Sequence, residues 1–470
     1  MLKFTNVAPL PPAKRSARER VGDSAEIYAG LSQAQASSQA ERCAQCGVPF
    51  CQNACPLQNN IPDWLKLTAE GRLREAYDIS AATNPMPEVC GRICPQDRLC
   101  EQACVVEQSR HGAVTIGAIE KHITETAWLN GWVQPVRPGQ ARGQSVGIVG
   151  AGPAGLAAAE RLRTLGYTVT VYDRHDRIGG LLTYGIPGFK LEKSVVERRA
   201  RRLIEAGVDF TLNCAVGADL DFETLRGRHD ALLIATGVYK ARPLDVAHAD
   251  RSVQALDYLT AASRADFGEH VEEFESGRLS AQGKNIVVIG GGDTAMDCVR
   301  TAIRRGAKSV TCLYRRDRSN MPGSIREVTC AEEEGVHFEW LAQPIEIGAH
   351  SVAATRMRLG VADADGRQAA HPVDGSAFAQ AADLVIAALG FEPENIPALW
   401  KAPQLDVRAS GALRVNPASF ETSIPGVFAA GDIVRGASLV VWALRDGLDA
   451  AESMHVRLSR SRQSQLVAAE

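Results

Sequence analysis

Apolar residues along this chain follow two patterns, which divide it into a helical part and an α/β part. Over roughly the first 140 residues, apolar side chains recur at helical spacing, most clearly in residues 61–67 and 116–128. Beyond that point, short continuous apolar runs predict buried strands instead. The clearest of these are residues 145–149, 168–172, 285–289 and 309–314, with three further runs that end in glycine at Gly237, Gly390 and Gly431.

The predicted strands belong to a unit that occurs twice. A strand at 145–149 is followed by a glycine-rich turn, a helix to Leu165 and a strand at 168–172, and the same order returns over residues 285–314. Strand–helix–strand units of this kind build parallel sheets. Two of them predict two Rossmann-like nucleotide-binding domains. The proline- and glycine-containing segment 134–143 predicts a linker before the first unit.

The first glycine-rich turn has the spacing of a dinucleotide fingerprint. It is Gly150-Ala151-Gly152-Pro153-Ala154-Gly155, and its three glycines permit a tight turn, close approach of a pyrophosphate and close helix–strand contact. Amides at the start of the helix then face the phosphates. Asp173, at the end of the next strand, can accept hydrogen bonds from ribose hydroxyls. The alternative is a glycine-rich turn without a ligand, but the strand, helix and acidic residue together favour dinucleotide binding.

A feature near the C-terminus indicates which dinucleotide the first turn binds. Gly431-Asp432 ends an apolar run and precedes a helix that we expect to begin at about Ser438. In flavoproteins with two dinucleotide sites, an aspartate in this context binds the ribityl–phosphate part of FAD, and the helix directs its positive end at the flavin ring. The alternative is a turn capped by aspartate. Other expected FAD contacts are Gly180, Leu181, Lys190, Thr236 and Gly237, of which Lys190 would reach the phosphates.

The second turn differs from the first in ways that favour NADPH. It is Gly290-Gly291-Gly292-Asp293-Thr294-Ala295, with alanine in the third position of the fingerprint. After the next strand stand Arg315 and Arg316 in place of an acidic residue, and guanidinium groups suit a 2′-phosphate. NADH, with both arginines in a solvated turn, is the alternative. Ala388, Leu389 and Gly390 are expected to return the chain beneath the nicotinamide.

Eight of the twelve cysteines lie in two short runs. The first run is Cys43, Cys46, Cys51 and Cys55, and the second is Cys90, Cys94, Cys100 and Cys104. Thiolates at such separations suit soft metal centres, and eight of them match two [4Fe–4S] clusters. Zinc is the alternative.

Each run need not hold one cluster. In two-cluster ferredoxins the cysteine before a proline ligates the other cluster, and both Cys55 and Cys94 precede proline. One expected ligand set is therefore Cys43, Cys46, Cys51 and Cys104. The other is Cys55, Cys94 and Cys100, with Cys90 or an oxygen of Glu120 as the fourth ligand.

Composition argues against several kinds of partner. A net charge of −3 is unlike the footprint of a nucleic-acid-binding protein. No apolar stretch approaches the ~18 residues of a membrane helix, and no secretory signal follows Met1. Cysteines confined to one segment of a long chain do not form a disulfide framework. We therefore expect a cytoplasmic protein without nucleic-acid or membrane partners.

Together these motifs resemble one family. The segments that carry the resemblance are residues 44–51, 90–95, 150–155, 185–190, 290–297, 314–316 and 429–433. They are similar to the small (beta) subunits of bacterial NADPH-dependent glutamate synthase. The wider family contains FAD and NAD(P)H modules with an N-terminal double [4Fe–4S] domain, as in dihydropyrimidine dehydrogenase.

The resemblance implies an electron-input subunit of glutamate synthase. Such a subunit oxidises NADPH at FAD and passes electrons through [4Fe–4S] clusters to a large (alpha) subunit with FMN, which makes L-glutamate from L-glutamine and 2-oxoglutarate. The alternative is the NAD(P)H-oxidising subunit of a dihydropyrimidine dehydrogenase or NADPH–ferredoxin oxidoreductase complex. In dihydropyrimidine dehydrogenase a glutamine at the position of Glu120 ligates iron, so an oxygen ligand stays open here.

The expected fold is α/β, with two Rossmann-like domains of the glutathione-reductase-like kind and an N-terminal α-helical iron–sulfur domain. We expect the cluster domain at 1–140, a split FAD domain at 144–280 and 391–470, and an inserted NADPH domain at 281–390. Hydride transfer between nicotinamide and flavin depends on alignment more than on an acid or base. No catalytic side chain is therefore predicted.

Overall fold

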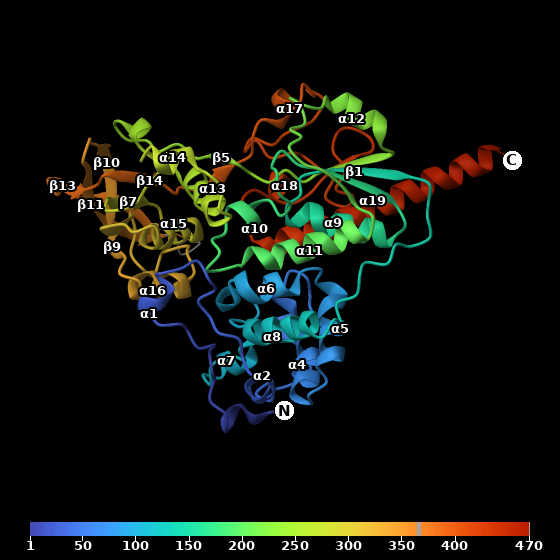
Figure 1. Ribbon diagram of the computed structural model, residues 1–470, viewed down its shortest axis with the longest axis horizontal. Helices are drawn as coiled ribbons and strands as arrows, with labels where there is room; N and C mark the ends of the chain where they lie inside the picture. Colours follow the sequence, from blue (N-terminus) through green and yellow to red (C-terminus); the bar gives the residue numbers. More distant parts are fainter. Residues whose placement is uncertain (364–367, 470) are drawn as a thin grey trace.

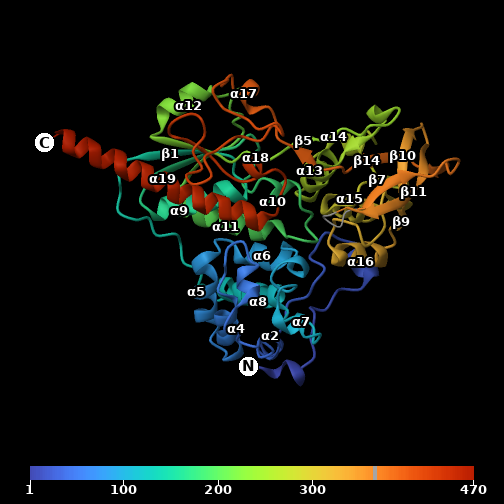
Figure 2. The same ribbon diagram turned by 180° about the vertical axis from the view of Figure 1, so that it is seen from behind.

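The computed structural model has three lobes, and it describes residues 1–363 and 368–469, with side chains as far as Arg460. A helical lobe carries the N-terminus and lies below two α/β lobes in Figure 1. We call the α/β lobe built on β1 (Ser145–Val149) the first sheet lobe, and the one built on β7 (Asn285–Ile289) the second sheet lobe. Figure 2 shows from behind that α19 (Val440–Ala469) runs through the first sheet lobe and projects from it.

The helical lobe contains short helices around an apolar core. In α4 (Ile61–Ala69) a proline occupies the first turn, where no amide donor is needed, and Trp64 and Leu65 are buried. They pack with Ile119 of α8 (Ile116–Leu129), which confirms the two helical periods in the sequence. The other helices are α1 (Ala17–Arg20), α2 (Gln33–Ala40), α3 (Phe50–Asn53), α5 (Leu73–Thr83), α6 (Pro87–Ile93) and α7 (Val105–Gln108), with 3-10 turns at Lys3–Thr5 and Gln96–Arg98.

The first sheet lobe has a parallel five-stranded sheet in the order β16-β4-β1-β2-β3. Val149 at the end of β1 pairs with Tyr172 and Ile234, so the carboxyl ends of the strands meet at one edge. Its elements are α9 (Pro153–Thr164), β2 (Thr168–Tyr172), α10 (Leu181–Tyr184), α11 (Lys193–Glu205), β3 (Asp209–Thr211), α12 (Phe222–Arg228), β4 (Ala231–Ile234), α17 (Ile396–Leu399), β16 (Val427–Ala429), α18 (Asp432–Arg435) and α19.

The second sheet lobe repeats this plan with the order β6-β14-β7-β8-β9. Two antiparallel strands, β5 (Lys240–Ala241) and β15 (Phe391–Glu392), connect it to the first sheet lobe. Its other elements are a 3-10 turn (Ala249–Arg251), β6 (Val253–Gln254), α13 (Ala255–Asp266), α14 (Glu272–Glu275), α15 (Asp293–Arg304), β8 (Ser309–Tyr314), α16 (Ile325–Glu333), β9 (His337–Trp340) and β14 (Leu384–Ala387). Two parallel α/β sheets confirm the predicted fold class.

The pairing of β6 bears on where the inserted part begins. β6 pairs with β14, and Tyr258 and Leu259 of α13 belong to the apolar core of the second sheet lobe. The predicted range 144–280 would place both elements with the first sheet lobe. We therefore propose that the insertion begins near Val253 instead of residue 281.

A small antiparallel sheet in the second sheet lobe has no counterpart in the sequence-based prediction. It consists of β10 (Ala342–Ile347), β11 (Ser351–Ala362), β12 (Gln368–Pro372) and β13 (Phe378–Ala381). Only some residues of β11 are buried, namely Val352, Ala354 and Met357. A sheet that buries one face produces no continuous apolar run, so the search for such runs missed it.

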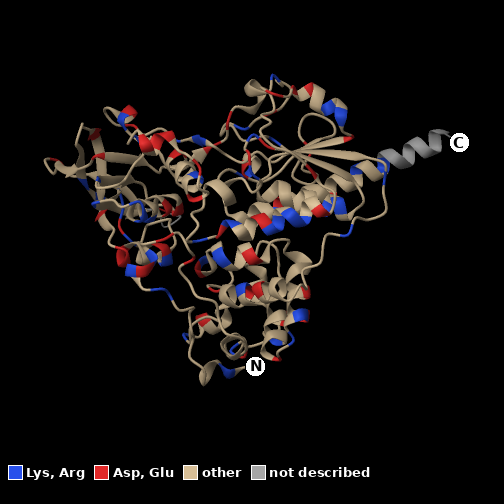
Figure 3. Ribbon diagram, viewed as in Figure 1, with Lys and Arg blue, Asp and Glu red and all other residues tan. Residues whose placement is uncertain are grey.

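Neither the distribution of charge nor the apolar character of the helices sets one of the three lobes apart. Lys and Arg are interspersed with Asp and Glu on all of them (Figure 3). Among the described residues, no helix combines the length and apolar character that crossing a bilayer requires.

Candidate functional site

The first glycine turn joins β1 to α9 in a conformation that only glycine accommodates. Gly150 has φ of 116°, and a Cβ there would lie 2.2 Å from the carbonyl oxygen of Ala235. A Cβ on Gly155 would lie 1.9 Å from the Gly150 carbonyl oxygen. A Cβ on Gly152 would meet no atom within 4 Å. The two outer glycines therefore close the turn, while the middle one leaves open space in front of the helix.

Polar groups gather beside this turn at the carboxyl ends of β2 and β4. Asp173 accepts hydrogen bonds from the backbone amides of Ala151 (2.7 Å) and His175 (2.8 Å), so the carboxylate is tied to the turn. The hydroxyl of Thr236 is buried and finds no hydrogen-bond partner among the described residues. Thr236 and Gly237 both line the cavity described below. An orphaned buried hydroxyl there fits a polar ligand group.

The C-terminal part of the chain closes over the same turn. Gly431 has φ of 76°, and Asp432 begins α18 and accepts a hydrogen bond from Ser438 (2.6 Å). Burial raises the pKa of Asp432, and the Ser438 hydroxyl partly offsets this shift. A Cβ on Gly447 of α19 would lie 2.1 Å from the Ala154 carbonyl oxygen, so α19 crosses directly over the start of α9.

The predicted contacts Gly180, Leu181 and Lys190 lie at the border of the two sheet lobes. Gly180 approaches the first turn, since a Cβ on it would lie 3.0 Å from the Cα of Gly152. Leu181 lines the cavity. The Lys190 ammonium lies 2.9 Å from Asp297 and 3.7 Å from Glu327, which both belong to the second sheet lobe. Lys190 is therefore held by carboxylates in this structure.

The second glycine turn repeats the geometry of the first. Gly290 has φ of 146°, and a Cβ on it would lie 2.2 Å from the Ala388 carbonyl oxygen. Leu389 and Gly390 follow Ala388 in the return toward β15. A Cβ on Gly292 would meet nothing within 4 Å. Asp293 accepts a hydrogen bond from the Ser324 amide (2.9 Å), Thr294 follows it at the start of α15, and Ala295 is fully buried.

The two predicted phosphate-binding arginines follow β8. Arg315 is exposed and Arg316 is partly buried. In the stretches of chain that the structure describes, neither guanidinium pairs with a carboxylate, whereas the neighbouring Arg318 pairs with Glu332. Both arginines lie outside the lining of the cavity. Their donors are available to an anion at the outer end of the second turn.

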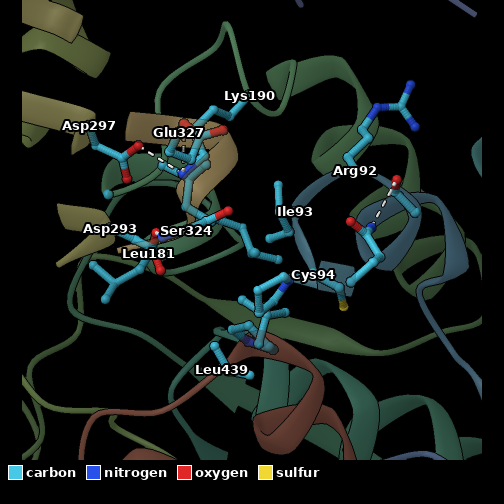
Figure 4. Close-up of a pocket in the computed structure, with 18 of the residues that line it drawn as sticks. Arg92, Ile93, Cys94, Leu181, Lys190, Asp293, Asp297, Ser324, Glu327 and Leu439 are labelled. Atoms are coloured by element: carbon cyan, nitrogen blue, oxygen red, sulfur yellow. Dashed lines mark hydrogen bonds and ion pairs between the residues drawn. The ribbon is translucent and has the colours of Figure 1, made fainter. Parts of the chain in front are cut away.

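A cavity of about 720 Å³ lies where the three lobes meet. Figure 4 shows Cys94 and Ile93 on its helical-lobe side, Leu181 on the first sheet lobe, and Asp293 on the second. The predicted site residues on its wall are Cys94, Gly150, Gly152, Pro153, Ala154, Asp173, Leu181, Lys190, Thr236, Gly237, Asp293, Thr294 and Asp432. The cavity thus brings both glycine turns and one cysteine together.

Some cavity residues were not predicted from the sequence. Ile93, Tyr239 and Leu439 line it, as does Arg326, which pairs across the lobes with Glu101 (2.5 Å). Ile93 and Leu439 lie next to predicted residues or elements, so proximity in sequence was a usable signal for them. The Arg326–Glu101 pair joins residues far apart in the chain, so no local signal in the sequence could have revealed it.

One set of cysteines surrounds a small cavity in the helical lobe. Cys43, Cys46, Cys51 and Cys104 line it together with Pro49 and other apolar side chains. Burial raises the pKa of Cys51 to about 12, with further contributions from Cys104 and Cys43. Neighbouring thiols raise one another's pKa because two thiolates repel, and a cationic centre between them would reverse the shift.

The other cysteines lie near Glu120, which acts on the pKa of Cys55, Cys94 and Cys100, and Cys94 also lines the large cavity. A hydrogen bond with Cys90 and burial raise the pKa of Cys94, and burial raises that of Cys100, with contributions from Cys55 and Glu120. Glu120 accepts hydrogen bonds from Asn84 (3.1 Å) and Ser80 (3.4 Å). Among the described residues, no three His, Cys, Asp or Glu side chains are arranged to hold a single metal ion.

Two protein-family models match the chain. Residues 20–132 match the model described as dihydropyrimidine dehydrogenase domain II, 4Fe-4S cluster, and residues 144–447 match that of pyridine nucleotide-disulphide oxidoreductases. The match at the N-terminus covers both cysteine runs, and the longer one covers both glycine turns.

Similar proteins extend over nearly the whole length. The glutamate synthase [NADPH] small chain of Azospirillum brasilense is 61% identical, over 97% of this chain and 96% of that protein. The protein of the same name from Escherichia coli is 45% identical, over 96% of this chain and 98% of that one. The solved structure of Mycobacterium tuberculosis FprA in complex with NADPH, at 21% identity, covers 68% of this chain and 86% of its own with a TM-score of 0.58, which shows a shared fold.

Proposed function

This chain belongs to the family of glutamate synthase [NADPH] small chains, and from that premise we propose that it is the electron-input subunit of glutamate synthase. It is an NADPH-dependent oxidoreductase with an iron–sulfur domain. In the proposed role it oxidises NADPH at FAD and passes the electrons through [4Fe–4S] clusters to a large FMN-containing subunit. That subunit makes L-glutamate from L-glutamine and 2-oxoglutarate.

The cavity at the meeting point of the lobes is the observation that carries this proposal. The two glycine turns reach it from opposite sheet lobes, and Cys94 reaches it from the helical lobe. A two-electron donor, a flavin and a one-electron acceptor can therefore share one space. Apolar side chains such as Ile93, Leu181 and Leu439 form part of its wall.

We assign FAD to the first turn. Gly150, Gly152, Pro153, Ala154 and Gly155 would cradle the pyrophosphate, because the open face at Gly152 is where a side chain would otherwise stand. Asp173 would accept bonds from the ribose and the unpartnered Thr236 hydroxyl would gain a partner. When bound, FAD supplies the exchange between a hydride and single electrons. The remaining proposed contacts are Gly180, Leu181, Gly237, Gly431 and Asp432.

NADPH is assigned to the second turn. Gly290, Gly292, Asp293, Thr294 and Ala295 present the helix start to its pyrophosphate. Arg315 and Arg316 would bind the 2′-phosphate, since their guanidinium groups have no carboxylate partner among the described residues. Ala388, Leu389 and Gly390 would lie near the nicotinamide end.

For the helical lobe we propose two [4Fe–4S] clusters. The set Cys43, Cys46, Cys51 and Cys104 surrounds one cavity, which supports a common cluster. The second cluster would use Cys55, Cys94 and Cys100, with Cys90 or Glu120 as fourth ligand. Both candidates lie near this set, since each acts on the pKa of Cys55 and of Cys94, and Asn84 contacts the Cys90 sulfur (3.7 Å) and the Glu120 carboxylate.

Chemical analysis and turnover test the proposal together. Anaerobically purified protein should contain FAD, about eight iron atoms per chain with matching acid-labile sulfide, and should oxidise NADPH with ferricyanide. With the large subunit added, it should support glutamate formation. Stoichiometric zinc without sulfide would overturn the cluster assignment. NADPH oxidation without glutamate formation would overturn the assignment of the partner.

The helical lobe supports a second candidate, because its matching family model is named for dihydropyrimidine dehydrogenase. In that case the chain would serve a pyrimidine-reducing or ferredoxin-reducing partner. Reconstitution with each partner separates the two functions. The cytoplasm as the site of action and the absence of nucleic-acid and membrane partners remain part of the proposal.

A further inference from the structure

Two buried groups of ion pairs attach the first sheet lobe to its neighbours, one on each side. One group faces the helical lobe and the other faces the second sheet lobe. The two share no residue. The role inferred for these ion pairs rests on the proposed function, in which the first sheet lobe exchanges electrons with both neighbours.

The pair toward the helical lobe joins α6 to α11. Arg199 donates from Nε and Nη2 to the two carboxylate oxygens of Glu88, each at 2.8 Å. The Glu88 side chain is 0% exposed and that of Arg199 is 3% exposed. Such a two-pronged geometry fixes direction as well as distance. α6 also carries Cys90 and is capped at its C-terminal end by Cys94, which lines the cavity, so the pair sets where this cysteine lies relative to the first glycine turn.

The contact toward the second sheet lobe is formed by the loop that follows α10. Its Phe189 is buried, and the guanidinium carbons of Arg300 and Arg304 lie 4.5 and 3.9 Å from the ring centroid. The next residue, Lys190, pairs with Asp297 of α15 and approaches Glu327 of α16.

The neighbouring carboxylates keep the Lys190 ammonium of this second contact protonated. Burial lowers the pKa of Lys190, but Asp297 and Glu327 outweigh it and hold the pKa above its ordinary value. Glu327 is shared with Arg300 (2.5 Å), which also pairs with Glu334 (2.8 Å). Because Asp297 lies one turn after the second glycine turn, the contact sets where that turn lies relative to the FAD side of the cavity.

We propose that these are two independent positioning devices: Lys190 with Asp297 and Glu327 aligns the NADPH side for flavin reduction, and Arg199 with Glu88 aligns the cysteine side for electron transfer from the flavin to the iron–sulfur centre. Hydride transfer requires near-contact alignment. Electron transfer depends on the separation of donor and acceptor. A shift of either neighbour should therefore slow one step and spare the other.

The test measures the two steps separately in Lys190→Met and Arg199→Met holoenzymes. Stopped-flow absorbance at saturating NADPH reports flavin reduction. Light-driven reduction of the flavin with deazaflavin, followed by freeze-quench EPR, reports cluster reduction without NADPH. Arg226→Met is the matched control, because it removes an exposed pair with Glu223 on α12, remote from both contacts.

We expect opposite effects in the two variants. Lys190→Met should slow flavin reduction by about tenfold to a hundredfold with cluster reduction unchanged, and Arg199→Met should do the reverse, because misplacement of about 1 Å costs up to about a hundredfold. Arg226→Met should alter neither step. FAD and iron contents should match those of the wild type.

Equal slowing of both steps in each variant, or of neither, would overturn the inference. If a methionine variant fails to fold, Asp297→Asn and Arg199→Lys weaken the same contacts more gently and should show the same selectivity to a smaller degree. Measurements on the wild-type enzyme separate a failure of this inference from a failure of the proposed function. A wild type that performs both steps leaves the proposed function in place whatever the variants do.

Discussion

The two glycine turns are alike in backbone and differ in what covers them. In both, the first glycine has positive φ and lies against a carbonyl oxygen of a neighbouring strand end, that of Ala235 or Ala388. The first turn is crossed by α19 at Gly447, and its helix touches the turn at Gly155. Among the described residues, no helix crosses the second turn in this way; a loop contacts it instead, since the Gly323 amide donates to the Gly291 carbonyl oxygen, and Arg315 nearby is exposed.

Under the proposed assignment of FAD and NADPH, this difference would let one motif serve two kinds of ligand. A site closed by another part of the chain suits a cofactor that stays bound, because release requires the covering helix to move. A site with an exposed cationic edge suits a coenzyme that enters and leaves at each turnover. In this proposal the fingerprint selects the pyrophosphate, and the surroundings decide whether the nucleotide is retained or exchanged.

The largest effect should come from Gly155→Ala. The added Cβ would lie 1.9 Å from the Gly150 carbonyl oxygen, so α9 must move away from β1. We expect a loss of about 1–3 kcal/mol in the free energy of unfolding and protein that purifies without FAD. The measurement is the FAD-to-protein ratio with thermal unfolding. Gly227→Ala, where a Cβ meets nothing within 4 Å, is the control. Full FAD content in Gly155→Ala would contradict the assigned role.

Replacing both Arg315 and Arg316 with alanine should come next in size. A charge-assisted hydrogen bond is worth about 1.5–3 kcal/mol, so the loss of even one such bond to the 2′-phosphate should lower kcat/KM for NADPH by at least about tenfold, while that for NADH changes little. The ratio of kcat/KM for the two coenzymes is the quantity to measure. Arg226→Ala, another exposed arginine, controls for lost surface charge. An unchanged ratio would remove both arginines from the 2′-phosphate site.

Gly447→Ala tests the closure itself. Its Cβ would lie 2.1 Å from the Ala154 carbonyl oxygen and would lift α19 from α9. Overpacking of this kind costs about 1–3 kcal/mol, and part of it should appear as faster release of FAD. Dialysis against FAD-free buffer, followed by flavin fluorescence, measures the release. Release at the wild-type rate would show that α19 does not retain the cofactor.

Ala295→Gly should have the smallest effect. The second turn already accommodates a Cβ at this position, so removing it leaves only a minor gap. We expect a loss of roughly 0.5–1 kcal/mol in unfolding free energy from glycine in a helix, with KM for NADPH almost unchanged. A large rise in KM would mean that this methyl group helps to shape the nucleotide site.

Local spacing in the sequence was sufficient to predict both glycine turns and to locate the two cysteine runs. Gly150 and Gly290 are required by backbone conformation, and a turn of that shape is encoded within six residues. The strand β11 was missed because polar residues such as Thr355 and Arg356 interrupt its apolar positions, so no long apolar run marks it. The pair between Lys190 and Asp297 could not be read from the sequence, while the contact of Lys190 with the FAD phosphates stays a prediction.

The sequence by itself determined the parallel α/β fold, the two nucleotide turns and the cysteine-rich helical part, because each follows from residues close together in the chain. Only the tertiary structure decided that Cys94 faces the cavity, that Arg199 pairs with Glu88, and that α19 covers the first turn. These contacts join residues far apart in sequence. Their geometry depends on how whole lobes pack, and no local pattern of apolar or charged residues records it.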